Sequence, residues 1–186
     1  MTKARLMLTI TMITLVINGL AGCSSTPDVD TSPDSEIIPL IGVGPQVGKL
    51  APDFEFTDAE GNSTSLSNLR DKYIILNFWQ TWCQPCKYEM PLLQDLAYDQ
   101  EKADNGLILL TVNSGESADT VQRFMKERGF SFRVLLDVEK GLSRSYNVRF
   151  IPTTFFIGQD GIISNIRVGA FMNEDQLEKI LNTFIK

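Results

Sequence analysis

A run of seven mostly apolar residues, Tyr73 to Trp79, ends in a short polar turn that carries Cys83 and Cys86 with two residues between them. Such near-continuous hydrophobicity predicts a strand that is covered on both faces. Apolar residues at helical spacing begin directly after the cysteines. The two thiols are therefore expected where a buried strand passes into a helix, and the rest of the chain is organised around this junction.

The start of a helix is a favourable place for a reactive thiol. The first helical turn has unpaired N–H groups and the positive end of the helix dipole. A cysteine there can have a pKa of roughly 3.5–7.5, against about 8.5 for free cysteine. Cys83 opens the turn, should be exposed and is the predicted attacking thiol. Cys86 lies one turn deeper, where it can resolve a mixed disulfide, and Pro85 suits the first helical turn.

Two other interpretations of the cysteine pair are open. The pair could be half of a zinc site, which needs two more ligands, but the chain has no histidine and only one further cysteine. It could also be a static structural disulfide. The placement between strand and helix favours redox chemistry over both.

Several motifs resemble one known family. Trp82-Cys83-Gln84-Pro85-Cys86 after an apolar strand resembles the thioredoxin superfamily. The wider stretch Leu76 to Pro91, with Ala51-Pro52-Asp53-Phe54 upstream and Ile151-Pro152-Thr153 downstream, resembles its extracytoplasmic TlpA/ResA-like branch. The resemblance implies an α/β thioredoxin fold, with a central mixed β-sheet flanked by helices and an extra N-terminal β-hairpin. It also implies thiol-disulfide exchange by the Cys83–Cys86 pair, with no further cofactor and no metal.

Hydrophobic periodicity and turn residues predict the elements in order. Strands are expected at 54–57, 63–65, 73–79, 107–112, 132–136, 154–157 and 162–168. Helices are expected at 67–70, 85–101, 117–128, 140–146 and 174–185. Pro91 should kink the second of these helices.

The N-terminus reads as a lipoprotein signal. Residues 1–22 combine a basic start with an apolar stretch that is too short to span a bilayer comfortably. They end in Leu-Ala-Gly before Cys23, which resembles a bacterial lipobox and implies lipidation of this cysteine. An ordinary signal peptide or an uncleaved anchor is the alternative. Residues 23–46 are polar and proline-dotted, as in a flexible linker, and a thioredoxin-like domain is expected at 47–186.

The predicted location and partners follow from this layout. Cys23 would anchor the domain to the bacterial membrane on its extracytoplasmic side, where disulfides persist. The net charge of −6 argues against nucleic-acid binding. The resemblance implies protein substrates with cysteine pairs, such as apocytochrome c during cytochrome c maturation, and a membrane electron donor resembling CcdA or DsbD. A reductant is the expected direction.

Disulfide exchange needs a group that accepts the proton of Cys86. Many thioredoxins have a buried aspartate on the central strand, but the matching residue here is Asn77, which cannot titrate; the ResA-like branch shares this departure. Glu89 is three residues after Cys86 and on the same helix face. The resemblance implies an acid there, lining a cavity beside the cysteines. Partial burial would raise its pKa toward neutrality, whereas an ordinary solvated glutamate is the alternative.

Two further regions are candidates for substrate contact. Ile151-Pro152-Thr153 resembles the cis-proline loop of the superfamily, which faces the cysteines and can pair with an extended substrate by β-augmentation. Ile151 would then touch the sulfurs. Trp82, next to Cys83, is expected on the surface that meets the partner, although core packing is the usual role of an aromatic residue near such a turn.

Two rival functions are open. A peroxiredoxin-like peroxidase is one, because Ala51-Pro52-Asp53-Phe54 also occurs in that relative. Peroxiredoxins resemble one another in a Pro-x-x-x-Thr-x-x-Cys site, however, and here Thr81 is two residues before Cys83 and the proline is missing. A non-enzymatic chaperone that binds Cu(I) through Cys83 and Cys86 is the other. The absence of histidine and of a methionine cluster near the turn weighs against it.

Overall fold

The computed structural model describes residues 41–57 and 61–185. The predicted signal segment 1–22, the predicted lipidation site Cys23 and the linker up to residue 40 lie outside the described residues. Within the described part of the chain, no helix has both the length and the apolar character that crossing a membrane requires.

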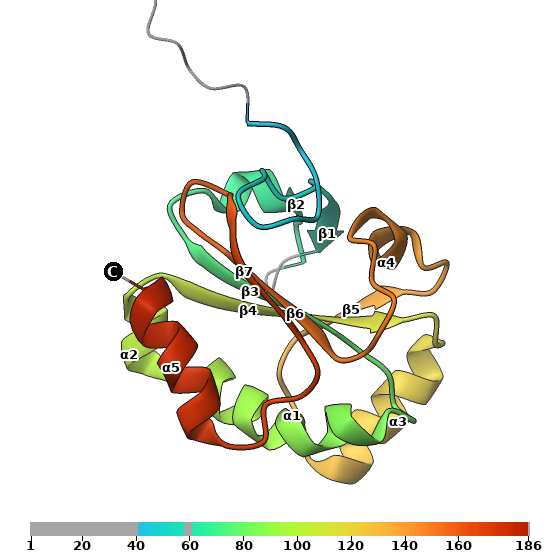
Figure 1. The fold of residues 1–186 in the computed structure, drawn as a ribbon. Coiled ribbons are helices and arrows are strands. Elements are labelled where there is room, and N and C mark those ends of the chain that lie inside the picture. The colour runs from blue at the N-terminus through green and yellow to red at the C-terminus, as the bar shows by residue number, and fades with distance from the viewer. Residues whose placement is uncertain (1–40, 58–60, 186) are drawn as a thin grey trace, which may run out of the picture. The chain divides into compact units, whose positions relative to one another are not determined.

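Five strands form one mixed sheet in the order β5-β4-β3-β6-β7 (Figure 1). They are β3 (Tyr73–Trp79), β4 (Leu107–Ser114), β5 (Val134–Asp137), β6 (Thr153–Ile157) and β7 (Ile163–Val168). Strand β3 lies in the centre, parallel to β4 and antiparallel to β6. All of its residues are buried, as its hydrophobic run predicts. The predicted central mixed sheet is confirmed.

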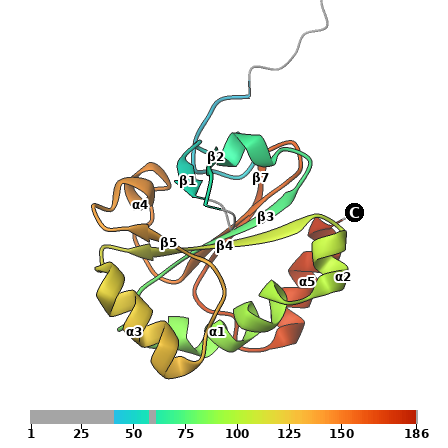
Figure 2. The same cartoon turned by 180° about the vertical axis from the view of Figure 1, so that it is seen from behind.

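Helices cover both faces of this sheet. Helices α1 (Gln84–Ala97), α3 (Ala118–Arg128) and α5 (Glu174–Phe184) lie on one face. Helix α4 (Gly141–Ser145) and the N-terminal hairpin lie on the other face, as the views from the front and from behind agree (Figures 1 and 2). The cysteines at the start of α1 therefore belong to the face that α1, α3 and α5 cover.

The alternation of side chains along β3 divides the core between the two faces. The cluster on the α4 face contains Ile74, Leu76 and Phe78. The clusters on the α1 face contain Tyr73, Ile75 and Trp79. Asn77 follows the second alternation and so points toward α1, which brings an amide into the neighbourhood of the candidate site.

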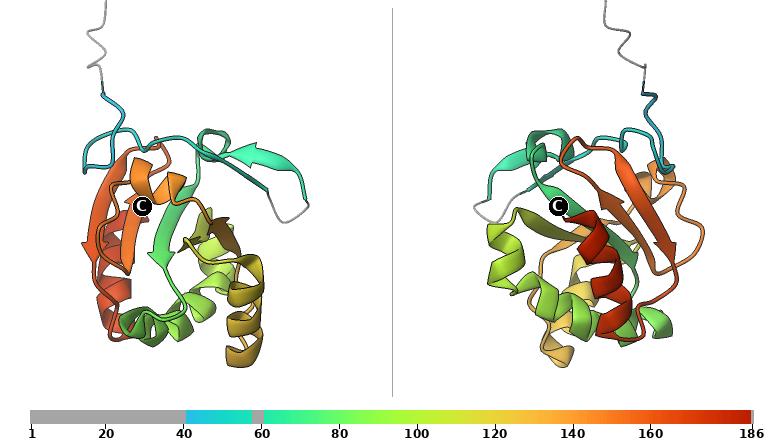
Figure 3. Two further views of the ribbon diagram at one scale, coloured as in Figure 1. Left: turned by 90° about the vertical axis from the view of Figure 1, so that its right-hand side faces the viewer. Right: turned by 60° about the vertical axis from the view of Figure 1, so that its left-hand side comes forward.

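The predicted N-terminal hairpin is confirmed. Strands β1 (Glu55–Thr57) and β2 (Ser63–Ser65) pair antiparallel, with Phe56 opposite Thr64. The short 3-10 helix η1 (Leu66–Leu69) follows directly. Figure 3 shows the hairpin reaching out from the sheet.

Residues 41–46, which the sequence pattern assigns to the linker, fold back on the chain just after them. Leu50 exchanges backbone hydrogen bonds with Gly42 and Gly44, at 3.2 and 3.0 Å. The N–H of Gly48 donates to the carbonyl of Ile163 at 2.8 Å, at the start of β7. The predicted boundary at residue 47 therefore falls inside a segment that backbone hydrogen bonds hold against the sheet.

The single helix predicted for residues 85–101 is wrong. Helix α1 ends at Ala97, and a separate helix α2 runs over Gln100–Asp104. The cause is Asp99, whose carboxylate accepts a hydrogen bond from the N–H of Lys102 at 3.0 Å and so caps a new helix. Pro91 lies within α1, as predicted.

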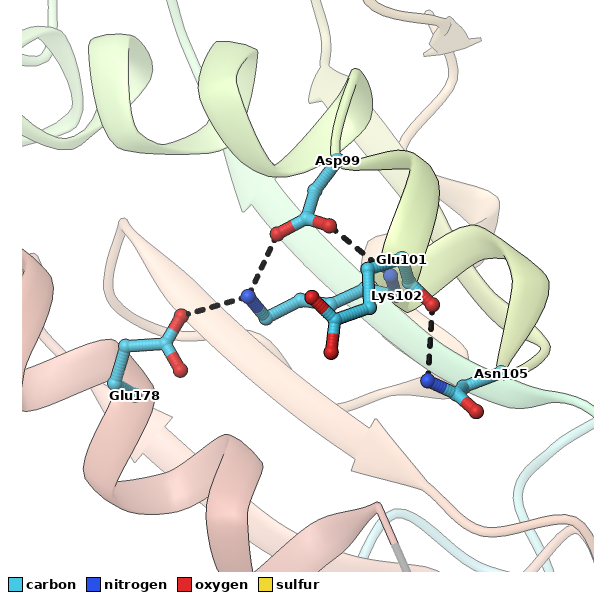
Figure 4. Close-up of polar contacts among 5 residues, drawn as sticks. All are labelled: Asp99, Glu101, Lys102, Asn105 and Glu178. Carbon is cyan, nitrogen blue, oxygen red and sulfur yellow. Dashed lines mark hydrogen bonds and ion pairs between the residues drawn. The ribbon is translucent and has the colours of Figure 1, made fainter.

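Lys102 connects α2 to α5 (Figure 4). Its Nζ lies 2.7 Å from a carboxylate oxygen of Asp99 and 3.0 Å from one of Glu178. The hydrogen bond between Lys102 and Asp99 raises the pKa of the lysine and lowers the pKa of the aspartate. All three side chains remain partly exposed, so the cluster contributes on the order of 0.5–1 kcal/mol.

Candidate active site

The two cysteines lie at the junction of β3 and α1 and are joined by a disulfide bond. After Trp79 the chain makes a turn over residues 80–83, in which the N–H of Cys83 donates to the carbonyl of Gln80 at 3.2 Å. Cys83 is the N-cap of α1, and Pro85 follows in its first turn. The Sγ atoms of Cys83 and Cys86 are 2.05 Å apart. The predicted position of the pair between strand and helix is confirmed.

The prediction that Cys83 is exposed is wrong for this oxidised form. Cys83 is 3% exposed and Cys86 is 0% exposed. The reason is packing: both cysteines belong to a cluster with Trp79 and Met90, and Ile151 packs against it. The small exposed fraction that remains belongs to Cys83, whereas Cys86 has none.

The first turn of α1 presents a hydrogen-bond donor to the outer sulfur. The backbone N–H of Cys86 donates to Sγ of Cys83 at 3.2 Å. In the reduced protein the same donor and the helix dipole would favour a thiolate on Cys83. The structure therefore provides the electrostatic setting that the sequence pattern predicts for the attacking thiol.

The predicted cis-proline loop is present and lies against the cysteines. The peptide bond between Ile151 and Pro152 is cis. The carbonyl oxygen of Ile151 lies 3.7 Å from Sγ of Cys83. In the oxidised form this sulfur carries no proton, so the approach is a contact rather than a hydrogen bond. Phe150, just before the loop, is 69% exposed.

Glu89 is buried completely, at 0% exposure, rather than partly as expected. Its Oε1 accepts a hydrogen bond from Nδ2 of Asn77 at 2.8 Å. Its Oε2 accepts one from the N–H of Phe171 at 3.0 Å. Asn77 in turn donates to Oγ1 of Thr154 at 2.9 Å, so one amide ties helix α1 to strands β3 and β6.

Burial raises the pKa of Glu89 from its ordinary 4.5 to about 7. The hydrogen bonds from Asn77 and Phe171 and the charge of Arg167 act in the opposite direction, because they favour the carboxylate. The loss of hydration is the larger effect. A carboxyl with a pKa near neutrality, one helical turn beyond Cys86, can both accept and return a proton at neutral pH.

The two tryptophans beside the turn have opposite environments. Trp79 is 1% exposed, and its ring lies 5.7 Å from that of Phe124. Trp82 is 66% exposed. Trp79 is therefore a core residue, whereas Trp82 is available on the surface next to Cys83.

Glu116 is a residue of the site that the sequence pattern did not identify. Its carboxylate accepts hydrogen bonds from the N–H and the hydroxyl of Thr81, at 2.7 and 2.6 Å. It follows strand β4, and the carboxyl ends of neighbouring parallel strands meet at one edge of a sheet. That topological signal could have directed attention to the residues after Ser114.

In the described part of the chain, no metal site is found and a large cavity lies away from the cysteines. In the described ranges, no group of three or more His, Cys, Asp or Glu side chains is arranged to hold a metal ion. A cavity of about 770 Å³ is lined by residues of β1, β5 and α4, among them Phe56, Leu135 and Leu142. This cavity includes neither Cys83 nor Glu89 among its lining residues. The Cys83–Cys86 disulfide is a redox group that the chain itself supplies.

Comparisons with known proteins find similarity over most of the described part of the chain. Residues 47–166 match the model of the AhpC/TSA family. The thiol-disulfide oxidoreductase ResA of Geobacillus kaustophilus is 40% identical over 129 residues, which make up 69% of this chain and 73% of that protein. ResA of Bacillus subtilis is 38% identical over 135 residues, or 73% of this chain and 74% of that protein. The crystal structure of StoA from Bacillus subtilis matches with a TM-score of 0.59 and 31% identity, covering 69% of this chain and 95% of that one.

Proposed function

Because the chain belongs to the AhpC/TSA family and is a thiol-disulfide oxidoreductase of the ResA type, we propose that it is a membrane-tethered, extracytoplasmic reductant of protein disulfides. Its substrates are oxidised cysteine pairs in other proteins, such as those of apocytochrome c before haem attachment. Support for this substrate and direction comes from the resemblance to the ResA-like branch, since a fold alone does not set a substrate.

The proposed tether is lipid attached to Cys23. More than one acyl chain at this residue gives stable anchoring where a single chain does not. With Cys23 modified, Cys83 and Cys86 are the remaining thiols of the chain. The polar linker then keeps the domain near the membrane while leaving it free to meet protein substrates.

The first step of the proposed cycle is attack by the reduced domain. The Cys83 thiolate attacks one sulfur of the substrate disulfide, a mixed disulfide forms, and the other substrate sulfur leaves as a thiolate. The N–H of Cys86, 3.2 Å from Sγ of Cys83 in the oxidised form, supports this assignment because it stabilises negative charge there.

The second step is resolution by Cys86. Its thiol passes a proton to the Glu89 carboxylate, and the thiolate attacks Sγ of Cys83. The substrate leaves with its second sulfur reduced, and the domain is left with the Cys83–Cys86 disulfide seen in the structure. Two electrons have moved from the domain to the substrate. The buried carboxyl with a pKa of about 7 supports this role for Glu89.

Substrate binding is assigned to Trp82, Ile151 and Pro152. Trp82 is exposed beside the turn, and Ile151 contacts Sγ of Cys83 through its carbonyl oxygen. An extended substrate would pair with the backbone of this loop by β-augmentation. A membrane electron donor resembling CcdA or DsbD then reduces the disulfide again by the same exchange chemistry.

The single observation that carries the proposal is the disulfide at the N-terminus of α1, with its outer sulfur next to the cis-proline loop. The test of direction is the reduction potential of the Cys83–Cys86 pair in the full chain carrying Cys23→Ser. A value near that of thioredoxin, about −270 mV, or below it is expected. A value near the −120 mV or so of the oxidant DsbA would reverse the direction.

A further inference from the structure

The turn before Cys83 is attached to the end of β4 and to the residues just after it. Gln80 donates a hydrogen bond from Nε2 to the carbonyl of Ser114. Thr81 donates both its backbone N–H and its hydroxyl to the carboxylate of Glu116, at 2.7 and 2.6 Å. Two successive residues of the turn are therefore fixed by Ser114, the last residue of β4, and by Glu116 just after the strand.

The same turn sets the position of the outer cysteine. The N–H of Cys83 donates to the carbonyl of Gln80 at 3.2 Å, so Thr81 is an inner residue of a turn that ends at Cys83. Cys83 is also the N-cap of α1, where its Sγ faces the N–H of Cys86. A shift of Thr81 would thus move the sulfur relative to the donor that stabilises its thiolate.

Glu116 can hold Thr81 in place because its carboxylate accepts hydrogen bonds from several donors at once. Its Oε2 accepts from the N–H of Thr81 and from Nδ2 of Asn113, the latter at 2.8 Å, while Oε1 accepts from the Thr81 hydroxyl. Asn113 is fully buried on β4, so the carboxylate is itself held by the sheet. Trp82, at 66% exposure, adds little packing to hold the turn from the other side.

We propose that Glu116 is a positioning residue for Cys83: through Thr81 it holds the turn so that the Cys83 sulfur meets the N–H of Cys86. It touches neither sulfur, and it acts by placement rather than by its charge. Small displacements of a reacting group cost large factors in rate, so placement alone can have a measurable effect. The inference concerns thiol-disulfide exchange itself and does not depend on the proposed direction, tether or electron donor.

The test separates placement from charge. Glu116→Ala removes all three hydrogen bonds. In Glu116→Gln, the amide oxygen can accept from both N–H groups and the amide nitrogen can donate to the Thr81 hydroxyl, so placement is kept and the charge is lost. Thr81→Val removes only the hydroxyl contact. Glu127→Ala, at an exposed position on α3, is the matched control.

All variants are made in the full chain carrying Cys23→Ser, so that only two thiols remain, and the reduced proteins are alkylated with iodoacetamide between pH 4 and 10. Alkylation of Cys83 is followed by mass spectrometry, with circular dichroism as the check of folding. We expect Glu116→Ala to react roughly tenfold more slowly at pH 7, with the midpoint of its pH profile shifted upward. We expect an intermediate loss for Thr81→Val. Glu116→Gln should react at least as fast as the parent, because losing a nearby negative charge favours a thiolate.

Two results would overturn the proposal. One is a Glu116→Gln profile as impaired as that of Glu116→Ala, because the hydrogen bonds that Gln keeps would then not be what supports the reactivity of Cys83. The other is an unchanged rate and midpoint in a folded Glu116→Ala variant. If Glu116→Ala does not fold, an unchanged rate in Thr81→Val overturns the proposal in its place. Reduction potentials are measured in parallel. The potential of the parent tests the proposed direction of exchange, and an unexpected value there would not change the comparison of alkylation rates among the variants, which tests the role of Glu116.

Discussion

The backbone N–H of Cys86 points at the sulfur of Cys83 across 3.2 Å, and this relationship gives the two cysteines different roles. The outer sulfur receives a donor from the first turn of α1, where unpaired N–H groups are concentrated. The inner sulfur is fully buried. Cys83 is therefore arranged to ionise and to form the mixed disulfide, whereas Cys86 remains protected until that mixed disulfide forms.

The two cysteines should differ sharply when each is replaced. Cys83→Ser removes the attacking sulfur and is expected to abolish reduction of a protein disulfide. Cys86→Ser leaves attack intact and removes resolution, so the mixed disulfide with the substrate should accumulate. Non-reducing electrophoresis and mass spectrometry of the trapped species provide the measurement. Accumulation in Cys83→Ser instead would assign the roles the other way round.

Replacing Glu89 should change how stability depends on pH. The folded protein keeps the Glu89 proton up to about pH 7, whereas the unfolded chain loses it near 4.5. The stabilising contribution of the protonated form is thus complete below 4.5 and is lost as the pH rises to about 7. The stability of Glu89→Gln relative to the parent should therefore increase over this range, by on the order of 3 kcal/mol.

Urea denaturation at a series of pH values measures this difference, with Glu127→Gln as the control at an exposed position. The pH profile of disulfide exchange should also lose a transition near neutrality in Glu89→Gln. A stability difference that does not change with pH would mean that Glu89 titrates as an ordinary surface glutamate, and would remove it from the proposed proton transfer.

Replacing the two tryptophans should affect different properties: Trp79 the stability of the fold, and Trp82 the binding of substrate. Trp79→Ala empties a buried position and is expected to cost about 3–5 kcal/mol of stability. Trp82→Ala, at 66% exposure, should stay within about 0.5 kcal/mol of the parent. It should nevertheless lower kcat/KM for a protein disulfide by roughly tenfold, which corresponds to about 1.4 kcal/mol of contact with the substrate. Equal kcat/KM in Trp82→Ala and the parent would remove Trp82 from the substrate surface.

The ion cluster between α2 and α5 should contribute little to the stability of the fold, and this contribution should depend on salt concentration. Lys102→Met breaks the contacts with Asp99 and Glu178, and we expect a loss of about 0.5–1 kcal/mol at low ionic strength. Because 1 M salt screens charges beyond about 3 Å, the loss should shrink there. Thermal melts of Lys102→Met and of the exposed control Lys126→Met at both salt concentrations measure it. A loss of several kcal/mol that salt does not change would show that packing of the lysine stem dominates.

Local patterns in the sequence were sufficient where one segment determines its own structure. The apolar run of β3, the return strand β2 and the start of α5 at Glu174 all lie where the pattern predicts. The separate helix α2 was missed, although its signal is local, because the cap at Asp99 competes with a continuous apolar pattern.

Contacts between distant segments could not be predicted in this way. The sequence alone does not indicate that Glu116 accepts a hydrogen bond from the N–H of Thr81. Nor does it indicate that Glu89 accepts one from the N–H of Phe171. The burial of Cys83 likewise depends on Ile151, which is 68 residues further along the chain. For the site, the sequence therefore predicts the reacting groups, while the fold determines their exposure and their positioning partners.

The central claim is that Cys83 carries the reactive, ionised sulfur, and the most direct test is the pH dependence of its alkylation. The reduced full chain carrying Cys23→Ser is treated with limiting iodoacetamide, and the modified residue is identified by peptide mass spectrometry. We predict that Cys83 reacts first, with a midpoint below the value of about 8.5 for free cysteine. First modification at Cys86, or a midpoint for Cys83 at or above that of free cysteine, would contradict the account.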